Sequence, residues 1–381
     1  MDRWLIDPIK NDVKKKIILI TGPRQCGKTT LSLKIGEKEK TNYLNFDNKD
    51  HRTQILKGTW DRGKELLIFD EIHKMKNWKR WLKGIYDVEK EGHQFIVTGS
   101  AKLDVYRKFG DSLAGRFFQY HLYPMDLLEF AKGKKLGSKE AKEVIQTLMN
   151  VGGFLEPFLE GTKSFYNRWK KGHLDLILRQ DLLEFENVRD IISLEILIEL
   201  LRERVGSVIS YKNLSEELQT SDKTIKRWLT LLENSYIIFK VLPFSKNIAK
   251  SVLKQPKFYF YDIAQVKNEA ARFENLLALT ILKDCYYRQD VLGEESEFFF
   301  LKNSQGHELD FYYKTEDRQD LIEVKLSNES VSPHFKWFAP YFPGAQKFQV
   351  VLNLEQNRVS SDLVKICGVE NYILGLIPSK N

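Results

Sequence analysis

The feature that most constrains this chain is a short segment near its amino terminus, GPRQCGKT, which runs from Gly22 to Thr29. It fits the pattern G-x-x-x-x-G-K-[ST], follows the apolar run IILIT and opens the helical stretch TTLSLKIGEK. Glycines let the backbone wrap an anion, so that successive N–H groups and the helix start face phosphate oxygens. The sequence therefore predicts a phosphate-binding loop between a buried strand and a helix.

Individual residues of this loop have separate expected roles. Lys28 is expected to reach the β- and γ-phosphates of a nucleotide, and the Thr29 hydroxyl to bind Mg²⁺. An ordinary glycine-rich turn is the alternative, and the flanking strand and helix argue against it. The predicted nucleotide-binding residues are Gly22, Pro23, Arg24, Gln25, Cys26, Gly27, Lys28, Thr29 and Thr30.

Polar residues follow two further apolar runs. LLIFDEIH places Asp70 and Glu71 at the end of a buried strand, where two adjacent carboxylates are costly without a cation or water. We expect Asp70 to hold Mg²⁺ through its water shell and Glu71 to orient and polarise the attacking water. The run QFIVTGS contains Thr98 and Ser100 near its end. We expect Thr98 to sense the γ-phosphate. Ser100 could do the same, and capping of the next helix is an equal alternative for it.

The distribution of apolar residues divides the chain into three segments. Short apolar runs alternate with helical patterns up to about residue 150, which is typical of a parallel sheet buried on both faces. A helical pattern follows to about 250, and strands rich in Phe and Tyr then return. The apolar runs of the first segment lie at 16–20, 42–46, 66–70, 94–99 and 116–122.

Composition excludes several classes of protein. Hydrophobic residues make up 42% of the chain and charged residues 29%, a balance that excludes wholesale disorder. There is no apolar stretch of membrane-spanning length, and the start resembles no secretory signal. The three cysteines lie far apart and suggest neither a disulfide framework nor a zinc site, so we expect a cytoplasmic protein. The net charge of +8 permits a nucleic-acid partner without requiring one.

The chain resembles the AAA+ ATPases of bacteria and archaea that carry a DUF4143 carboxy-terminal region. The segments that carry this resemblance are GPRQCGKTTL, LLIFDEIHKMKNW, IVTGSAKL, SLAGRFFQYHLYPMDLLEF, GGFLEPF, KTIKRWLTLLENSYIIF, SKNIAKSVLKQPKFYFYD, ENLL and ELDF…LIEVK. The resemblance implies ATP and Mg²⁺ as ligands. It also implies that Arg116, in LAGR, is an arginine finger that enters a neighbouring subunit's site, and hence a side-by-side dimer or a ring. A local salt bridge is the alternative role for Arg116.

The middle segment contains a candidate DNA reader. Residues 209–241 have the rhythm of a winged helix-turn-helix, with Leu214 and Leu218 on a first helix and a helix cap at Ser221 or Asp222. Ile225, Trp228, Leu229 and Leu232 would form the apolar face of the second helix. Its exposed face would present Lys223, Lys226 and Arg227 to DNA. A helical domain that only packs or mediates subunit contact is the alternative.

The last segment resembles a PD-(D/E)xK nuclease core. HELDFYYKTEDRQDLIEVKLS reads as two strands, and a turn centred between Glu316 and Asp317 places Asp310 opposite Glu323. Two such carboxylates can hold Mg²⁺ while Lys325 helps to activate water. Glu274 matches an additional acid that some of these folds carry. A hairpin with a charged open face needs no metal, however, and a fold does not imply its function.

These expectations combine into one hypothesis with two rivals. We expect an α/β protein with a P-loop AAA+ ATPase domain at 1–150, a helical and winged-helix segment at 151–250, and a restriction-endonuclease-like α/β domain at 251–381. The expected activity is Mg²⁺-dependent ATP hydrolysis that drives action on DNA. The rivals are an ATP-licensed nuclease and a protein-docking switch in a defence or toxin–antitoxin system.

Overall fold

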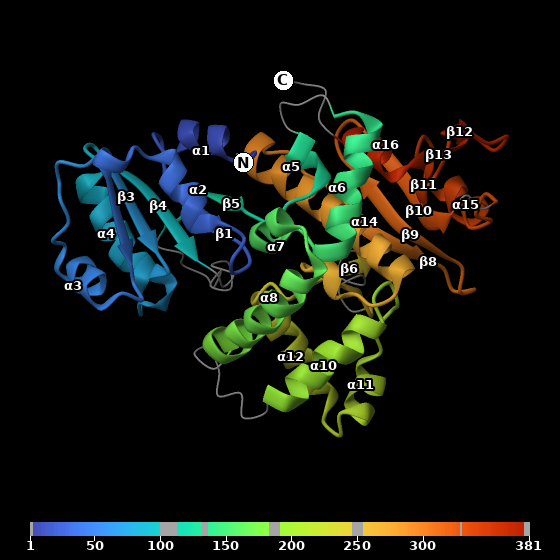
Figure 1. Ribbon diagram of the computed structural model, residues 1–381, viewed down its shortest axis with the longest axis horizontal. Coiled ribbons are helices and arrows are strands. Elements are labelled where there is room, and N and C mark those ends of the chain that lie inside the picture. The colour runs from blue at the N-terminus through green and yellow to red at the C-terminus, as the bar shows by residue number, and fades with distance from the viewer. Residues whose placement is uncertain are drawn as a thin grey trace. The chain divides into compact units, whose positions relative to one another are not determined.

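The computed structural model describes residues 3–99, 113–131, 136–182, 191–245, 254–327 and 330–376. The chain separates into two compact units (Figure 1). The first comprises Met1–Tyr123 with Asn234–Tyr236, and the second comprises Pro124–Glu233 with Ile237–Asn381.

The first unit is built on five parallel strands in the order β2-β3-β4-β1-β5. Its elements are α1 (Ile6–Asp12), β1 (Ile17–Thr21), α2 (Lys28–Ile35), η1 (Lys38–Lys40), β2 (Thr41–Asn45), α3 (Lys49–Lys57), β3 (Leu66–Asp70), η2 (Ile72–Lys74), α4 (Trp78–Glu89), β4 (Gln94–Gly99) and β5 (Phe117–His121). Every predicted apolar run forms a strand. The prediction of a parallel sheet is therefore confirmed.

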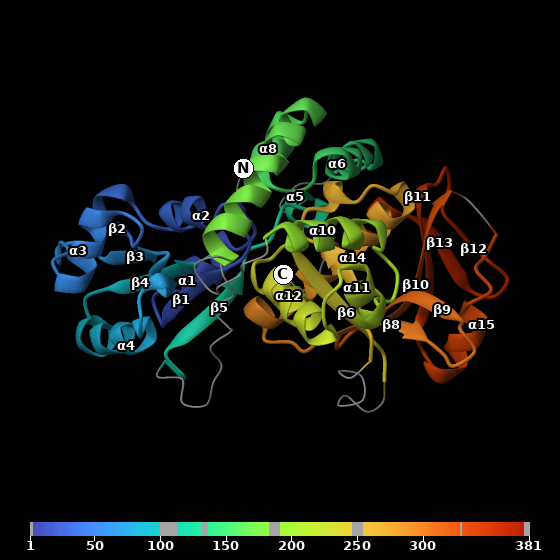
Figure 2. The ribbon, with the colours of Figure 1, turned by 90° about the horizontal axis from the view of Figure 1, so that it is seen from below.

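Both faces of this sheet are covered. Successive side chains of a strand point to opposite faces, so Leu67 and Phe69 share the face on which Ile55 of α3 and Leu82 of α4 complete an apolar core. The intervening Ile68 is also fully buried, and α2 contacts β4 on that other side (Figure 2). Burial on both faces explains why the strands are continuous apolar runs without alternation.

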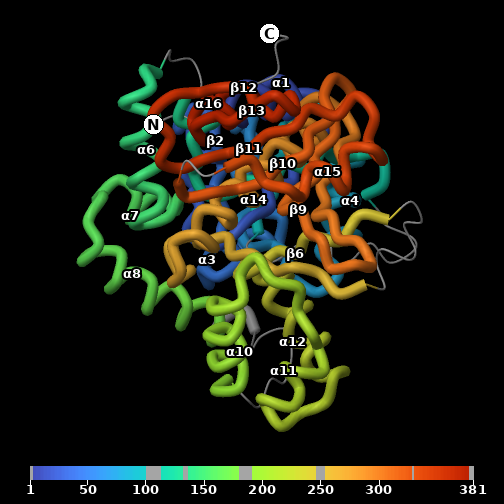
Figure 3. Tube along the Cα trace, turned by 90° about the vertical axis from the view of Figure 1, so that its right-hand side faces the viewer, coloured from blue at the N-terminus to red at the C-terminus, as the bar shows by residue number. Residues whose placement is uncertain are grey.

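The second unit begins with helices. They are α5 (Leu127–Ala131), α6 (Ser138–Val151), α7 (Leu155–Glu160), α8 (Lys163–Leu176), η4 (Ile177–Leu182), α10 (Ile191–Glu203), α11 (Tyr211–Glu217) and α12 (Asp222–Asn234). Figure 3 shows α10, α11 and α12 grouped in one lobe of the chain. Ser221 caps α12, because its hydroxyl accepts a hydrogen bond from the Thr224 N–H at 3.1 Å. Ser221 is one of the two residues that were predicted to cap this helix.

A mixed eight-stranded sheet forms the rest of this unit, in the order β12-β13-β11-β10-β9-β8-β6-β7. Helices α14 and α16 contact one face of it, and α15 packs its phenylalanines on the other. The elements are β6 (Ile238–Pro243), β7 (Lys257–Phe260), η5 (Ile263–Gln265), α14 (Glu269–Tyr287), η6 (Arg288–Leu292), β8 (Glu297–Lys302), β9 (Glu308–Lys314), β10 (Gln319–Ser327), α15 (Phe335–Phe338), η7 (Ala339–Tyr341), β11 (Gln346–Asn353), β12 (Arg358–Val359), β13 (Val364–Gly368) and α16 (Val369–Leu374).

The predicted second and third segments lie in one compact unit, which starts at Pro124. Strand β6 explains this grouping, because it follows α12 and pairs with both β7 and β8. The strand expected to form a wing is thereby part of the large sheet. The three-way division at residues 150 and 250 stays a prediction. None of the helices in the described ranges combines the length and the apolar character that crossing a membrane requires.

Candidate nucleotide-binding site

The predicted phosphate-binding loop leaves the carboxyl end of β1 and enters α2. Gly22 has φ +152°, and a Cβ atom built on it would lie 1.9 Å from the backbone oxygen of Leu122. Gly27 has φ +97° at the start of α2. The turn therefore requires glycine at Gly22, because a side chain there would collide with a backbone atom of the strand that runs beside β1.

Lys28 is buried and folded back across this loop. Its Nζ donates hydrogen bonds to the backbone oxygens of Gly22 at 2.9 Å and Pro23 at 2.6 Å. The ammonium group thus lies inside the curve of the loop, where an anion would meet it. A bound phosphate would replace these two carbonyl partners with charged oxygens, which form stronger hydrogen bonds with an ammonium group.

The carboxylate of Asp70 is the meeting point of three hydroxyl groups. The Thr29 hydroxyl donates to its Oδ2 at 2.8 Å, and the Tyr43 phenol donates to the same oxygen at 2.7 Å. The Thr98 hydroxyl donates to Oδ1. Asp70 ends β3, Thr98 is its pairing partner on β4, and Tyr43 lies on the neighbouring β2. Parallel strands end at the same edge of the sheet, which brings all of these groups beside the loop.

These groups suit a magnesium ion. Mg²⁺ prefers oxygen ligands and keeps several waters, so one or two carboxylates with a hydroxyl are a fitting protein contribution. Thr29 and Asp70 supply a hydroxyl and a carboxylate within 2.8 Å of each other, next to the loop. They are the residues that would hold the ion.

Glu71 follows Asp70 in a left-handed backbone conformation, with φ +55°. Its N–H donates to the Thr98 backbone oxygen of the neighbouring strand β4 at 3.1 Å, which holds Glu71 at the end of β3. Burial raises the pKa of the Glu71 carboxyl, whereas Lys28 and Arg24 act in the opposite direction. A carboxylate so placed, beside the phosphate-binding loop, can act as a general base.

His73 lies next to this carboxylate, with its Nε2 3.6 Å from Oε2 of Glu71. Burial, helped by Lys74, Lys28 and Arg24, lowers the pKa of His73 to about 3. The imidazole is therefore neutral at physiological pH, and its contact with Glu71 is not an ion pair.

The strand order explains the position of Thr98. Strand β4 lies between β1 and β3, with Thr98 paired to Ile20 on one side and to Asp70 on the other. Its side chain thus ends between the phosphate-binding loop and the Asp70–Glu71 pair, and its role as a sensor of the terminal phosphate stays a prediction. Ser100 lies outside the described residues.

Arg116 lies at the other end of the same strands. Its backbone oxygen accepts a hydrogen bond from the N–H of Ile17, the first residue of β1, whereas the loop follows the last, Thr21. The guanidinium pairs with Asp87 of α4 through Nε at 2.8 Å and Nη2 at 3.3 Å. This pair raises the pKa of Arg116 and lowers that of Asp87. Arg116 thus lies at the opposite end of the strands from the phosphate-binding loop.

Helix α12 has its apolar residues on a buried face and its basic residues on an exposed face, as predicted. Ile225, Trp228, Leu229 and Leu232 are buried. Lys223, Lys226 and Arg227 are exposed. The ammonium group of Lys226 lies 5.3 Å from the centre of the Tyr211 ring on α11. The first half of α12 therefore carries basic groups on its open face.

The carboxy-terminal hairpin has the predicted register. Tyr312 pairs with Leu321 and Phe311 with Ile322, which centres the turn between Glu316 and Asp317. The regular pairing of the two strands ends after these residues. At the next position of β9, the Asp310 carboxylate accepts a hydrogen bond from the Val324 N–H at 2.8 Å.

Asp310 and Glu323 lie close enough to interact. Burial, with the charges of Glu274 and Glu323, raises the pKa of Asp310 well above its usual value. Glu323 is 4% exposed, and Lys325 contacts its Oε1 at 3.0 Å. Its other carboxylate oxygen, Oε2, has no hydrogen-bond partner within the described ranges. The three predicted residues Asp310, Glu323 and Lys325 are therefore together.

Glu274 lies close enough to Asp310 to raise the pKa of that carboxyl, and its role as an additional acid of this cluster stays a prediction. Its Oε1 accepts a hydrogen bond from the Tyr259 phenol at 2.7 Å and lies 3.4 Å from Nζ of Lys257, which also contacts Glu308 at 2.6 Å. Burial alone would lower the pKa of Lys257, but the surrounding carboxylates outweigh it and raise that pKa. In the parts of the chain that the structure describes, no three His, Cys, Asp or Glu side chains are grouped as metal ligands.

Three residues of these sites were not predicted from the sequence. Tyr43 and Lys257 lie on strands that were expected only to build sheets, and Arg3 precedes the first helix. Arg3 donates to the backbone oxygen of Cys26 at 2.7 Å and so supports the loop from outside. The sequence held a signal for Lys257, which is its position in the aromatic run KFYF, because an isolated charge in a buried strand needs partners.

Two stretches of the chain match known domain families. Residues 14–131 match the family described as AAA domain, which covers β1 to α5 and therefore the whole candidate site. Residues 142–272 match a domain of unknown function, DUF8612. The resemblance to DUF4143 is not among these matches and stays a prediction.

Two curated proteins are similar to most of this chain. The chain is 26% identical over 343 residues to an uncharacterized protein of Methanocaldococcus jannaschii, spanning 82% of this chain and 75% of that protein. It is 24% identical over 338 residues to an uncharacterized protein of Mycobacterium tuberculosis, spanning 83% and 72%.

Solved structures that are similar include a Signal Transduction ATPase with Numerous Domains (STAND) protein with a tetratricopeptide repeat sensor from Pyrococcus horikoshii. It is 15% identical, with a TM-score of 0.24, over 74% of this chain and 47% of that one. Residues 14–131 are thus similar to AAA domains, and the observed loop lies within them.

Proposed function

We propose that this protein is a Mg²⁺-dependent ATPase that couples ATP hydrolysis to work on DNA. The observation that carries the ATPase assignment is the convergence of Thr29, Asp70 and Thr98 beside the folded-back Lys28. Such a group of a lysine, a hydroxyl and a carboxylate around an anion-binding loop fits the phosphates and the metal of a nucleoside triphosphate.

Each residue has a role that its position supports. The loop N–H groups and Lys28 would bind the β- and γ-phosphates, and Thr98 would contact the terminal one. Glu71 would accept a proton from the attacking water. Bound Mg²⁺ would neutralise charge on the phosphates, and Thr29 and Asp70 would hold it.

The test compares two substitutions in the full-length chain. Lys28→Ala should abolish nucleotide binding, because the phosphates lose their ammonium partner. Glu71→Gln should bind ATP but turn it over at least roughly 100-fold more slowly, since it removes the base and preserves the shape. Nucleotide binding by calorimetry and phosphate release measure the two effects. Unchanged turnover in both variants would overturn the site assignment.

Arg116 would act on the site of a neighbouring subunit. Arg116 lies at the end of its own sheet that is remote from its own phosphate-binding loop. This position supports an action on the loop of another subunit. Arg116→Ala and Glu71→Gln should each be inactive alone. When they are mixed, a Glu71→Gln subunit supplies its Arg116 to the intact site of an Arg116→Ala subunit.

Recovered activity in that mixture would support the finger, and an inactive mixture would contradict it. Asp87→Ala is the matched control, because it breaks the same ion pair and keeps the arginine. Particle size in the presence of ATP would show whether the subunits associate.

DNA would contact the open face of α12. The exposed Lys223, Lys226 and Arg227 near the start of this helix support that assignment, because basic side chains there can pair with phosphates. Replacing all three with Gln should reduce the slope of log affinity against log salt by about 0.9 for each phosphate that the variant no longer neutralises. Lys139, Lys163 and Lys171, exposed on α6 and α8, give a control of equal charge change. Equal effects of both sets would contradict a DNA site on α12.

A second candidate activity is Mg²⁺-dependent DNA cleavage by the carboxy-terminal unit. The observation that favours it is the buried Glu323 oxygen without a hydrogen-bond partner in the described part of the chain, beside Asp310 and Lys325. A cation at that oxygen would compensate the burial. Asp310→Asn and Lys325→Gln should each remove cleavage while ATP hydrolysis persists. Cleavage that survives both substitutions would exclude this site.

A further inference from the structure

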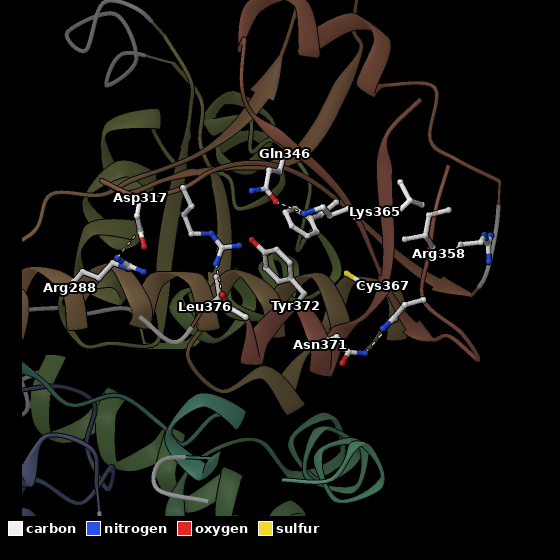
Figure 4. A pocket seen from close by; sticks show the side chains of 15 residues that line it. Arg288, Asp317, Gln346, Arg358, Lys365, Cys367, Asn371, Tyr372 and Leu376 are labelled. Atoms are coloured by element: carbon white, nitrogen blue, oxygen red, sulfur yellow. Dashed lines mark hydrogen bonds and ion pairs between the residues drawn. The ribbon is translucent and has the colours of Figure 1, made fainter. Parts of the chain in front are cut away.

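The carboxy-terminal unit contains a cavity of about 500 Å³ that shares no residue with either candidate site. Strands β11 and β13, helix α16 and the turn between β9 and β10 line it (Figure 4). This volume lies within the range of about 300–1,000 Å³ that is usual for small-molecule sites. The cavity can therefore hold a ligand of the size of a mononucleotide.

The charged residues that line the cavity are mostly cations. They are Arg288, Arg318, Arg358 and Lys365, with Asp317 as the one acidic residue of the lining. Figure 4 shows Arg288 and Asp317 on one side, Lys365 near the centre and Arg358 at the opposite rim. The cations of this lining would attract a ligand with negative charge and repel a cationic one.

Two guanidinium groups are held rigidly on one side. Arg318 donates to the Asp320 carboxylate and, at 2.9 Å, to the backbone oxygen of Gly375, and it lies 5.5 Å from the Tyr372 ring centre. Arg288 is 2% exposed and donates to three carboxylates, those of Asp284 at 3.0 Å, Glu294 at 2.8 Å and Asp317 at 3.5 Å. Each guanidinium has five N–H donors, so these contacts leave donors for a ligand. Holding the groups in place beforehand reduces the entropy that a ligand loses on binding.

Lys365 contributes a charge that no carboxylate pairs with among the described residues. Its Nζ donates to the neutral amide oxygen of Gln346 at 2.7 Å and lies 5.2 Å from the Phe348 ring centre. An anionic oxygen would be a stronger partner than that amide. Lys365 is exposed, so it can turn toward a ligand without disrupting the core.

The rest of the lining is apolar or neutral. Phe348, Val359, Ile366 and Leu376 present apolar surface. Burial raises the pKa of the Cys367 thiol to about 12, so this group stays uncharged at physiological pH. The amides of Asn357 and Asn371 add hydrogen-bonding groups at the edge. A ligand that is only an inorganic ion would leave these surfaces unused.

We propose that this cavity binds a small organic phosphate, with its phosphate between Lys365 and Arg318 and its organic body against Phe348 and Ile366. Phosphate carries more negative charge than a carboxylate, and it matches the fork of a guanidinium. The site is independent of the ATPase site.

The test uses the full-length chain with Lys28→Ala, so that the phosphate-binding loop does not contribute. Adenosine monophosphate, ribose 5-phosphate and inorganic phosphate are titrated separately by calorimetry. We expect the two organic phosphates to bind, and inorganic phosphate to bind at least roughly tenfold more weakly because it lacks the apolar body. Equal affinity for all three probes, or no binding of any, would overturn the proposal.

A second substitution assigns the binding to this cavity. Adding Lys365→Gln should weaken both organic phosphates roughly tenfold or more, and Lys365→Arg should restore most of the affinity. Lys347→Gln is the matched control, because Lys347 is absent from the lining and donates to the backbone oxygen of Asp362. Binding that is unaffected by Lys365→Gln, or that is weakened equally by Lys347→Gln, would place the ligand elsewhere. Thermal unfolding of each variant verifies that the fold persists.

Discussion

The phenol of Tyr43 donates a hydrogen bond to Oδ2 of Asp70 at 2.7 Å, the same oxygen that accepts from the Thr29 hydroxyl. Burial and the Asp70 carboxylate raise the pKa of Tyr43 to about 12, so the phenol remains a donor over the physiological range. When Thr29 turns toward a metal ion, Tyr43 and Thr98 are the donors that continue to hold Asp70. Tyr43 is therefore a positioning residue of the proposed magnesium site.

Tyr43→Phe should raise the Mg²⁺ concentration needed for half-maximal binding of Mg·ATP by roughly 10-fold, because partners that orient a metal ligand affect metal affinity by this order. The measurement is a Mg²⁺ titration of nucleotide binding in the Glu71→Gln background, where slow turnover keeps the nucleotide intact during the titration. Tyr86→Phe is the control, since the Tyr86 hydroxyl contacts the Lys15 backbone oxygen at 3.4 Å and not Asp70. An unchanged Mg²⁺ requirement in Tyr43→Phe would contradict the positioning role.

Gly22→Ala should abolish nucleotide binding and lower the melting temperature. A Cβ atom at Gly22 would lie 1.9 Å from the Leu122 backbone oxygen, and the loop must shift to relieve this clash. Gly84→Ala in α4 is the matched control, because its Cβ atom would have no neighbour within 4 Å and alanine favours a helix. Nucleotide titration and thermal unfolding of both variants measure the effect. Normal binding by Gly22→Ala would show that the loop tolerates a side chain there.

Lys283→Met should reduce the free energy of unfolding by about 3–5 kcal/mol, the usual cost of removing one partner from a buried ionic group. The ammonium group of Lys283 is 3.1 Å from Asp126 and from Glu129, and it also donates to the Pro124 backbone oxygen at 2.8 Å. Urea unfolding gives the value. Lys267→Met, at a side chain that is 62% exposed, should change it by less than about 1 kcal/mol. Similar losses of stability in the two variants would argue against a special role of the buried group.

Asp262 should make stability depend on pH. Burial raises its pKa from 3.8 to about 6 in the folded protein, although Gln265, Tyr166 and Arg202 oppose this shift. Between these two pH values the folded state binds the proton that the unfolded state has released. The contribution of Asp262 to stability is therefore fully present below pH 4, and about 3 kcal/mol of it is lost as the pH rises through 6.

Asp262→Asn should remove this dependence. The variant's free energy of unfolding relative to that of the unsubstituted protein is expected to rise between pH 4 and pH 7 and then to level off. Denaturant unfolding at a series of pH values measures the difference, so the contributions of other groups cancel. A constant difference across this range would show that Asp262 is ionised in the folded state already at pH 4.

Local patterns in the sequence predicted much of the nucleotide site. The loop, the Asp70–Glu71 pair and Thr98 each follow an apolar run that had to be a strand, and parallel strands bring their carboxyl ends together. Tyr43 was not predictable in this way, because a tyrosine on a half-buried strand is equally compatible with packing alone. Its role depends on β2 lying directly beside β3, which is a property of the strand order.

The carboxy-terminal cluster shows the same division. The turn fixed the register that brings Asp310 near Glu323, since antiparallel pairing follows from the turn position. The engagement of Glu274 with Tyr259 and Lys257 depends on how α14 packs against β7, and residues so far apart in the chain give no local signal of it.

Local spacing and the period of the apolar residues are enough to predict the phosphate-binding loop, the parallel sheet beneath it and the acids at the end of β3. The folded chain was needed to show which side chains surround those acids, at which end of the strands Arg116 lies and how the helical segment joins the large sheet. These depend on contacts between elements distant in the chain, whose free energy is set by packing and burial and not by neighbouring residues.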